Sequence, residues 1–150
     1  VADAVAAKAI FGAPVVVVDF GTATNMEVID KDGVFVGGVI APGVESSMRS
    51  LMSRAALLRA VELEDPGVAI GRDSSEAIQI GVVSGEAARV DGLVERIQAE
   101  LGYKTKVVAT GGLAHRIAPL SHTITEVDVE LTLQGLRLIY NELKKCDNQR

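Results

Sequence analysis

The sequence predicts an α/β domain in which a mixed five-stranded sheet is flanked by helices. Three strand candidates lie close together near the start of the chain, and helix and strand candidates alternate after them. Hydrophobic residues make up 48% of the chain but aromatic residues only 3%, so we expect a core of Val, Ile, Leu and Ala. A length of 150 residues suits one domain.

The first three strands are predicted at residues 14–19, 26–30 and 34–40. Asp32 and Gly33 form a tight turn that favours an antiparallel hairpin between the second and third strands. The glycine-rich stretch from Gly37 to Gly43 then breaks the strand pattern. A fourth strand is expected at 106–109 and a fifth near 124–127, which completes a mixed sheet.

Five helices are predicted, at residues 2–11, 44–58, 74–101, 113–117 and 131–144. The longest is expected to begin with Asp73 and Glu76 as a capping box and to stop at Gly102. The last helix is expected to turn one apolar face inward, formed by Leu133, Leu136, Ile139, Tyr140 and Leu143.

Three glycines interrupt the longest predicted helix. Gly81, Gly85 and Gly92 each cost about 1 kcal/mol relative to Ala inside a helix. Such a cost suggests that the helix backbone packs closely against another helix, for which a second subunit is one source.

Composition argues against several classes of partner. The net charge is −5 and no run of Lys or Arg provides an electrostatic footprint for DNA or RNA, so direct nucleic-acid binding is disfavoured. The single cysteine, Cys146, excludes an internal disulfide and fits a reducing cytoplasm. Apolar stretches are far shorter than the ~20 residues of a membrane helix. Because the chain begins at Val1 rather than Met, we expect the true N-terminus upstream.

The most informative stretch runs from a buried strand into a small-residue turn. Asp19 follows directly after five apolar residues, and Gly21, Thr22 and Thr24 come after it. Glycine permits close backbone approach and threonine hydroxyls can donate to phosphate oxygens, so this turn is a candidate nucleotide site. Asp19 itself is either a cation ligand or a carboxylate that accepts N–H bonds from its own turn.

Other motifs carry less information. Gly111 and Gly112 follow the fourth strand, where a flat base or ribose can lie against the backbone, although the pair also serves as an ordinary turn. The chain has no G-x-x-x-x-G-K-[ST] phosphate loop and no G-x-G-x-x-G after a strand. His115 and His122 lack the spacing and partners of a zinc site and are expected to lie on the surface.

Five blocks of this sequence carry a resemblance to a known family: DFGTATN at 19–25, GGVIAPGVESS at 37–47, GRDSSEAIQIGVVSG at 71–85, VVATGGLA at 107–114 and LTLQGLRLIY at 131–140. The predicted order of elements resembles that of the ribonuclease-H-like half-domain of the actin, hexokinase and Hsp70 superfamily. Within that superfamily, the blocks are most similar to type III pantothenate kinase, a family that includes Bvg accessory factors.

The resemblance implies a cytoplasmic homodimer that transfers the γ-phosphate of ATP to pantothenate, the first step of coenzyme A synthesis. It implies that residues 1–150 are the C-terminal domain of a two-domain kinase. The family's first phosphate motif, Asp-x-Gly-Asn-Thr, and its Gly-x-Asp-Arg with the proposed catalytic base are not in this sequence. We therefore assign no catalytic residue here, and we expect this chain to be inactive alone.

The resemblance also implies roles for individual residues. Asp19 would hold a monovalent cation, K⁺ or NH₄⁺, and Thr22, with Gly21 and Thr24, would bind the ATP phosphates. Ser74 stands where the family contacts pantothenate across the dimer interface, although a serine at a helix start is also often a cap. The phosphates and water would hold Mg²⁺.

Two alternatives stay open at the level of sequence. The chain could serve as a non-catalytic regulatory or accessory factor, as the Bvg name implies. It could also belong to another small-molecule kinase of the same superfamily, which the GRDSSEAIQ block disfavours.

Overall fold

The strand β1 (Val15–Phe20) lies at the centre of a five-stranded sheet in a computed structural model that describes residues 1–54 and 61–147. β1 pairs antiparallel with β2 (Ala23–Ile29), which pairs antiparallel with β3 (Phe35–Pro42). On its other side β1 runs parallel to β4 (Lys106–Thr110), and β4 runs parallel to the short β5 (Glu126–Val127). The order β3-β2-β1-β4-β5 confirms the predicted mixed α/β sheet.

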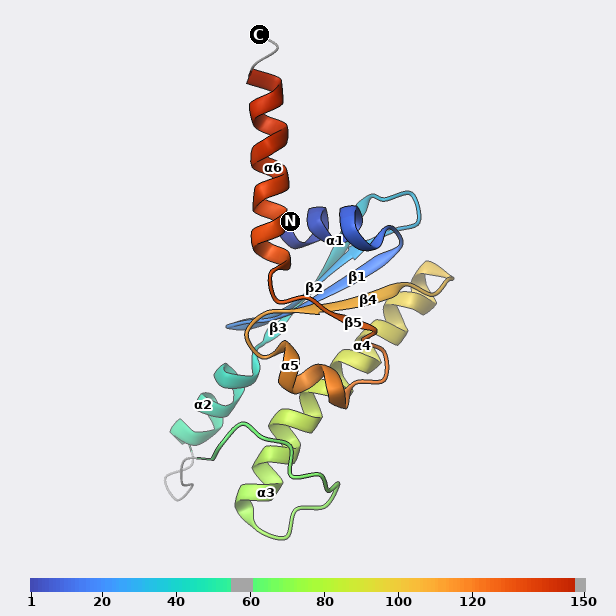
Figure 1. The fold of residues 1–150 in the computed structure, drawn as a ribbon. Helices are drawn as coiled ribbons and strands as arrows, with labels where there is room; N and C mark the ends of the chain where they lie inside the picture. Colours follow the sequence, from blue (N-terminus) through green and yellow to red (C-terminus); the bar gives the residue numbers. More distant parts are fainter. Residues whose placement is uncertain (55–60, 148–150) are drawn as a thin grey trace.

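Helices cover both faces of the sheet (Figure 1). α1 (Ala2–Phe11) and the base of α6 (Leu131–Asp147) lie on one face. α2 (Val44–Arg54), α4 (Gly85–Leu101) and α5 (Ala114–Ile117) lie on the other. The end of the predicted helix at 44–58 falls partly outside the described residues. No helix among the described residues has the length and hydropathy needed to cross a bilayer.

β1 is buried on both faces, so it divides the core in two. Val16 and Val18 point toward α4 and pack in one cluster with Val90. Val15 and Val17 point toward α1 and pack in the other cluster. An unbroken apolar run is typical of such a doubly covered strand, and it explains why the sequence shows no alternation here.

The long predicted helix is present but contains a wider turn. α3 (Ser74–Gln79) continues into a π-helical turn at Ile80–Ser84 and then into α4. The Asp73 carboxylate accepts a hydrogen bond from Glu76 N at 2.9 Å, and Gly102 ends the helix at φ 78°. The Glu76 carboxylate accepts from Arg72 N at 2.8 Å, one residue before the position of a standard capping box.

The predicted packing around the helix glycines is not found among the residues that the structure describes. A Cβ added at Gly81 or Gly92 would meet no atom within 4 Å among the described residues, and one at Gly85 would meet only Ile80 O at 3.5 Å. No helix of the described chain therefore approaches these positions, and packing by a second subunit stays a prediction.

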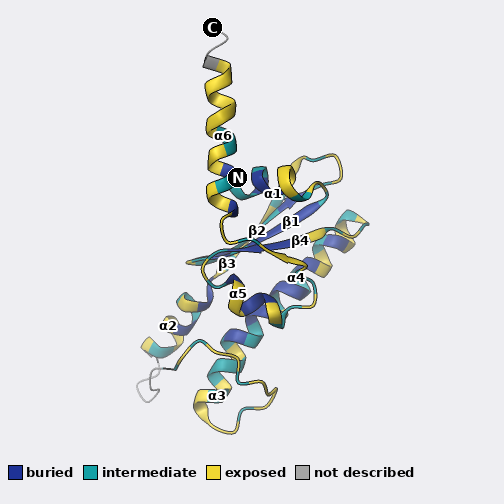
Figure 2. Ribbon diagram, in the orientation of Figure 1, coloured by how far each residue is buried: buried dark blue, intermediate teal, exposed yellow. Residues whose placement is uncertain are grey.

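The predicted inner face of α6 is wrong. Leu133 is 69% exposed and Leu143 61% exposed, because α6 projects away from the rest of the chain after its first turns. Figure 2 shows most of this helix as exposed. Only its base is packed: Leu131 is buried, and a Cβ at Gly135 would lie 2.0 Å from Ala2 O.

Candidate functional site

The backbone of the turn between β1 and β2 is hydrogen-bonded to the start of α2 and the residue before it. Gly43 N donates to Thr22 O at 3.3 Å, and Ser46 Oγ donates to the same carbonyl at 2.9 Å. A Cβ at Gly43 would lie 2.5 Å from Gly21 O, so only glycine allows this approach. Thr22 is exposed, and its hydroxyl has no hydrogen bond within the described chain. The backbone of the turn is thus fixed while the side chain that follows Gly21 remains available to a ligand.

Thr24 does not share this environment. It is 1% exposed, and its hydroxyl donates to Glu86 Oε1 on α4 at 2.6 Å. Glu86 is also paired with Arg89, which donates to Pro42 O at 2.8 Å. The predicted phosphate contact of Thr24 is not supported, because its one hydroxyl proton is donated to Glu86 in the core, on the face of the sheet that α4 covers.

A second turn, after β4, packs directly against the first. Gly111 has φ 91°, and a Cβ there would lie 2.4 Å from Asp19 Oδ1 and 2.6 Å from Phe20 O. Leu113 N donates to Phe20 O at 3.4 Å. Gly112 is exposed, with no atom within 4 Å of an added Cβ. The carboxyl ends of β1 and β4 therefore form one surface, the usual place for ligands in α/β sheets.

Asp19 lies at this surface in an unfavourable electrostatic environment. Burial raises the pKa of its carboxyl group, and the charges of Asp3 and then Glu27 raise it further. Gly21 N donates to Ala23 O rather than to the carboxylate. The alternative in which the turn caps its own aspartate is therefore not supported, and an oxygen-ligated cation fits the charge of Asp19.

Ser74 lies far from these two turns. It is exposed at the first position of α3, and Asp73 rather than Ser74 caps the helix. Twelve residues separate Ser74 from Glu86, which contacts β2, so the two lie roughly 18 Å apart along the helix axis. The structure does not bring Ser74 to the β1–β2 turn of its own chain.

One polar cluster was not predicted. Asp91 of α4 accepts hydrogen bonds from Ser121 Oγ at 2.5 Å and Thr123 Oγ1 at 2.6 Å. Burial alone would raise the pKa of Asp91, but these bonds and the N–H groups of His122 and Thr123 lower it. His122 is exposed, as predicted, and lies between two carboxylates: its Nδ1 is 2.7 Å from Asp91 Oδ2 and its Nε2 is 2.9 Å from Glu95 Oε1. The cluster fastens the loop before β5 to α4.

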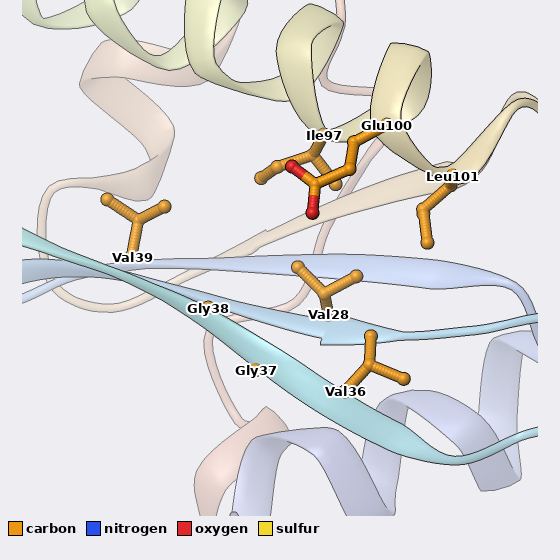
Figure 3. A pocket seen from close by; sticks show the side chains of 8 residues that line it. All are labelled: Val28, Val36, Gly37, Gly38, Val39, Ile97, Glu100 and Leu101. Carbon is orange, nitrogen blue, oxygen red and sulfur yellow. The ribbon is translucent and has the colours of Figure 1, made fainter.

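The described residues offer no group of three or more His, Cys, Asp and Glu side chains arranged for a metal. His115 is exposed, as predicted. A cavity of about 200 Å³ lies near the other end of the sheet (Figure 3). Val28, Val36 and Val39 line it from the sheet, and Ile97, Glu100 and Leu101 from α4. None of the residues predicted for the site belongs to it.

Comparison with known proteins agrees with the fold described above. Solved structures with the same fold include a putative Baf family transcriptional activator from Campylobacter jejuni, with TM-score 0.68 and 22% identity over 96% of this chain and 65% of that one. Another is the activator of 2-hydroxyisocaproyl-CoA dehydratase from Clostridium difficile with bound ADPNP, with TM-score 0.65 and 18% identity over 99% of this chain and 68% of that one. At these identities the likeness shows the fold alone.

Relatives found by sequence identify the family as well as the fold. A type III pantothenate kinase from Thermomicrobium roseum is 48% identical over 97% of this chain and 56% of its own length. One from a Roseiflexus strain is 50% identical over 93% of this chain and 55% of its own. The chain thus spans about half the length of these curated relatives. The family model for type III pantothenate kinase matches residues 1–96. This chain belongs to the type III pantothenate kinase family.

Proposed function

We propose that the complete protein, of which this chain forms the C-terminal domain, transfers the γ-phosphate of ATP to pantothenate. Family membership supports this activity. The structural observation that carries it is the pair of packed turns at the carboxyl ends of β1 and β4, where Gly111 leaves no room for a side chain beside Asp19. Phosphoryl transfer depends mainly on positioning and charge neutralisation, which fixed backbone turns supply.

The β1–β2 turn is the proposed phosphate-binding element. Thr22 presents an exposed hydroxyl that can donate to a phosphate oxygen, and Gly21 leaves the approach to the backbone open. Gly111 and Gly112 form the wall against which the adenosine lies, and the exposed surface at Gly112 has space for it. Thr24 is excluded from this set because its hydroxyl is bonded to Glu86.

Two ions belong to the proposal. Asp19 is the ligand of a monovalent cation, K⁺ or NH₄⁺, because its carboxylate is partly buried and receives no hydrogen bond from its own turn. Such a cation supplies the positive charge that lets Asp19 stay ionised beside a phosphate-binding turn. The phosphates and water hold Mg²⁺, since this ion retains several waters in nucleotide sites.

Pantothenate binding is proposed at a homodimer interface in the cytoplasm. Ser74 lies roughly 18 Å along the helix from the residue that contacts β2, so it cannot serve the turn of its own chain. In a dimer, its exposed hydroxyl can contact a substrate bound beside the turns of the other subunit. The open glycine positions on the same helix, Gly81 and Gly92, leave space for close subunit packing.

The test is a phosphorylation assay with Thr22→Val and Thr22→Ser in a version of the protein that extends upstream of Val1. Loss of one hydrogen bond to a charged phosphate removes about 1.5–3 kcal/mol, so kcat/KM for ATP should fall by roughly 10- to 100-fold in Thr22→Val. Thr22→Ser keeps the hydroxyl and should retain most activity. An unchanged kcat/KM in Thr22→Val would exclude the phosphate contact.

Three further measurements test the activity itself. Residues 1–150 alone should show no turnover, and robust turnover by this chain would refute the site assignment. A panel of acceptor alcohols separates pantothenate from other substrates of small-molecule kinases. Binding of pantothenate without phosphorylation by the extended protein would favour the accessory-factor alternative.

A further inference from the structure

A buried hydroxyl without a partner lies beside Asp19. Thr110 is 0% exposed, and its Oγ1 has no hydrogen-bond partner in the described chain. Asp3 Oδ1 is likewise buried and without a partner there. Buried polar atoms are nearly always paired, because an unpaired one loses its hydration without compensation. Two such atoms near one partly buried carboxylate indicate that a ligand supplies the missing interactions.

The register of the sheet places Thr110 next to Asp19. The two residues are direct partners on the parallel strands β1 and β4, so their side chains leave the same face of the sheet. This is the face covered by α1, because Val17, two residues before Asp19, packs with Ala7 in the same cluster. Thr110 Oγ1 is therefore directed into the space between the sheet and α1.

The geometry of α1 places Asp3 over the same point. The short connection between α1 and β1 makes them antiparallel, so the first turn of α1 lies over the carboxyl end of β1. Asp3 lies one helical turn before Ala7 and on the same face, about 6 Å along the axis. Asp19 lies two strand residues beyond Val17, about 6.6 Å. The two carboxylates thus face each other, which agrees with the effect of Asp3 on Asp19.

We propose that Asp3 and Thr110 complete the monovalent-cation site of Asp19. This inference rests on the proposed cation role of Asp19 and adds its ligand set. The site combines two carboxylates and a hydroxyl, all oxygen donors of the kind that hard cations prefer. Glu27 does not join it, because its carboxylate already accepts a hydrogen bond from Ala4 N at 2.9 Å. A bound cation would remove the repulsion between Asp3 and Asp19 and give Thr110 its missing partner.

The test measures thermal unfolding of the 150-residue chain against KCl, with choline chloride holding the ionic strength constant. A cation that binds only the folded state raises the melting temperature in a saturable way. We expect this K⁺-dependent rise in the wild type and its loss in Asp19→Asn. Asp3→Asn and Thr110→Val should each weaken the apparent K⁺ affinity at least tenfold, and Thr110→Ser should retain it.

The sign of the effect without K⁺ separates a cation ligand from an ordinary structural residue. In choline chloride, Thr110→Val removes an unpaired hydroxyl and Asp3→Asn removes a repulsion, so both should melt at or above the wild-type temperature. Asp32→Asn, at an exposed turn, is the matched control and should keep the full K⁺ response. Melting of Thr110→Val well below the wild type in choline chloride would contradict the inference.

Other outcomes are equally decisive. A K⁺ response lost in Asp19→Asn but intact in Asp3→Asn and Thr110→Val would overturn the ligand set and leave the role of Asp19 standing. Stabilisation by MgCl₂ but not by KCl would overturn the monovalent identity. No cation response in the wild type would overturn the site altogether. The phosphorylation assay on the extended protein decides the kinase proposal independently of all three.

Discussion

Gly111 is the residue whose replacement most directly tests the packing of the two turns. In Gly111→Ala the new Cβ would lie 2.4 Å from Asp19 Oδ1 and 2.6 Å from Phe20 O, at a backbone φ of 91°. The left-handed conformation costs Ala about 1–2 kcal/mol and the enforced backbone shift about 1–3 kcal/mol. Ala also restricts the unfolded chain more than Gly does, and this offsets about 0.4–1 kcal/mol of the loss. The net loss of unfolding free energy should therefore be about 1–4.5 kcal/mol.

Urea denaturation and thermal melting followed by circular dichroism measure this loss. For a domain of this size, 1 kcal/mol corresponds to about 2–4 °C, so the melting temperature should fall by roughly 2–18 °C. Gly112→Ala is the matched control, because its Cβ meets no atom within 4 Å and its φ is not positive. It should be unchanged or up to about 1 kcal/mol more stable. Equal stabilities of the two variants would refute the reasoning.

Two further predictions concern the opposite face of the sheet. Thr24→Val removes the hydroxyl that donates to Glu86, so it should lower the unfolding free energy measured in urea by about 1–3 kcal/mol. Thr24→Ser keeps the hydroxyl and should stay close to wild type. A Thr24→Ser variant less stable than Thr24→Val would contradict the structural role of Thr24. The hydrogen bond to Glu95 and then the charge of Asp91 raise the pKa of His122 above its ordinary value of about 6.5. The contribution of His122 to folding stability is therefore complete below about pH 6.5, and it is lost as the pH rises through the pKa of the folded state. The stability difference between wild type and His122→Gln, measured from about pH 5 to about pH 9, should shrink with increasing pH, and a difference independent of pH would exclude the ion pairs.

Most of the fold was predictable because local signals and topology agree. The Asp32-Gly33 turn specified the β2–β3 hairpin, and Gly33 has φ 74° as such a turn requires. Gly102 and Asp73 marked the two ends of the long helix. The strand boundaries were less accurate: β2 begins at Ala23 rather than at Met26, because pairing with β1 extends it beyond its apolar run.

The site was only partly predictable. Period-two alternation already placed Thr24 on the same face as Met26 and Val28, which are buried, and this signal outweighs the resemblance of the motif. Glu86 carried a similar signal, since it falls on the helical face that includes Val83 and Val90. The pairing of Asp19 with Thr110 depends on strand register between segments about 90 residues apart, which the sequence alone does not specify.

The exposed face of α6 shows another limit of sequence patterns. Leu133, Leu136, Tyr140 and Leu143 predict that one side of the helix packs against something, but they do not say whether that partner lies in the same chain. In the described structure only the first turns of α6 contact α1. The apolar spacing was therefore real, and its assignment to the core of this domain was wrong.

The π-helical turn at Ile80–Ser84 has a consequence for how the chain tolerates length changes. A turn closed by i→i+5 bonds absorbs one extra residue, equivalent to about 100° of helix rotation, without altering the phase of the helices on either side. Deleting one residue within it should yield an uninterrupted α-helix that still directs Ser74 the same way. The same deletion within α4 would instead swing Ser74 around the axis by more than a quarter of a turn.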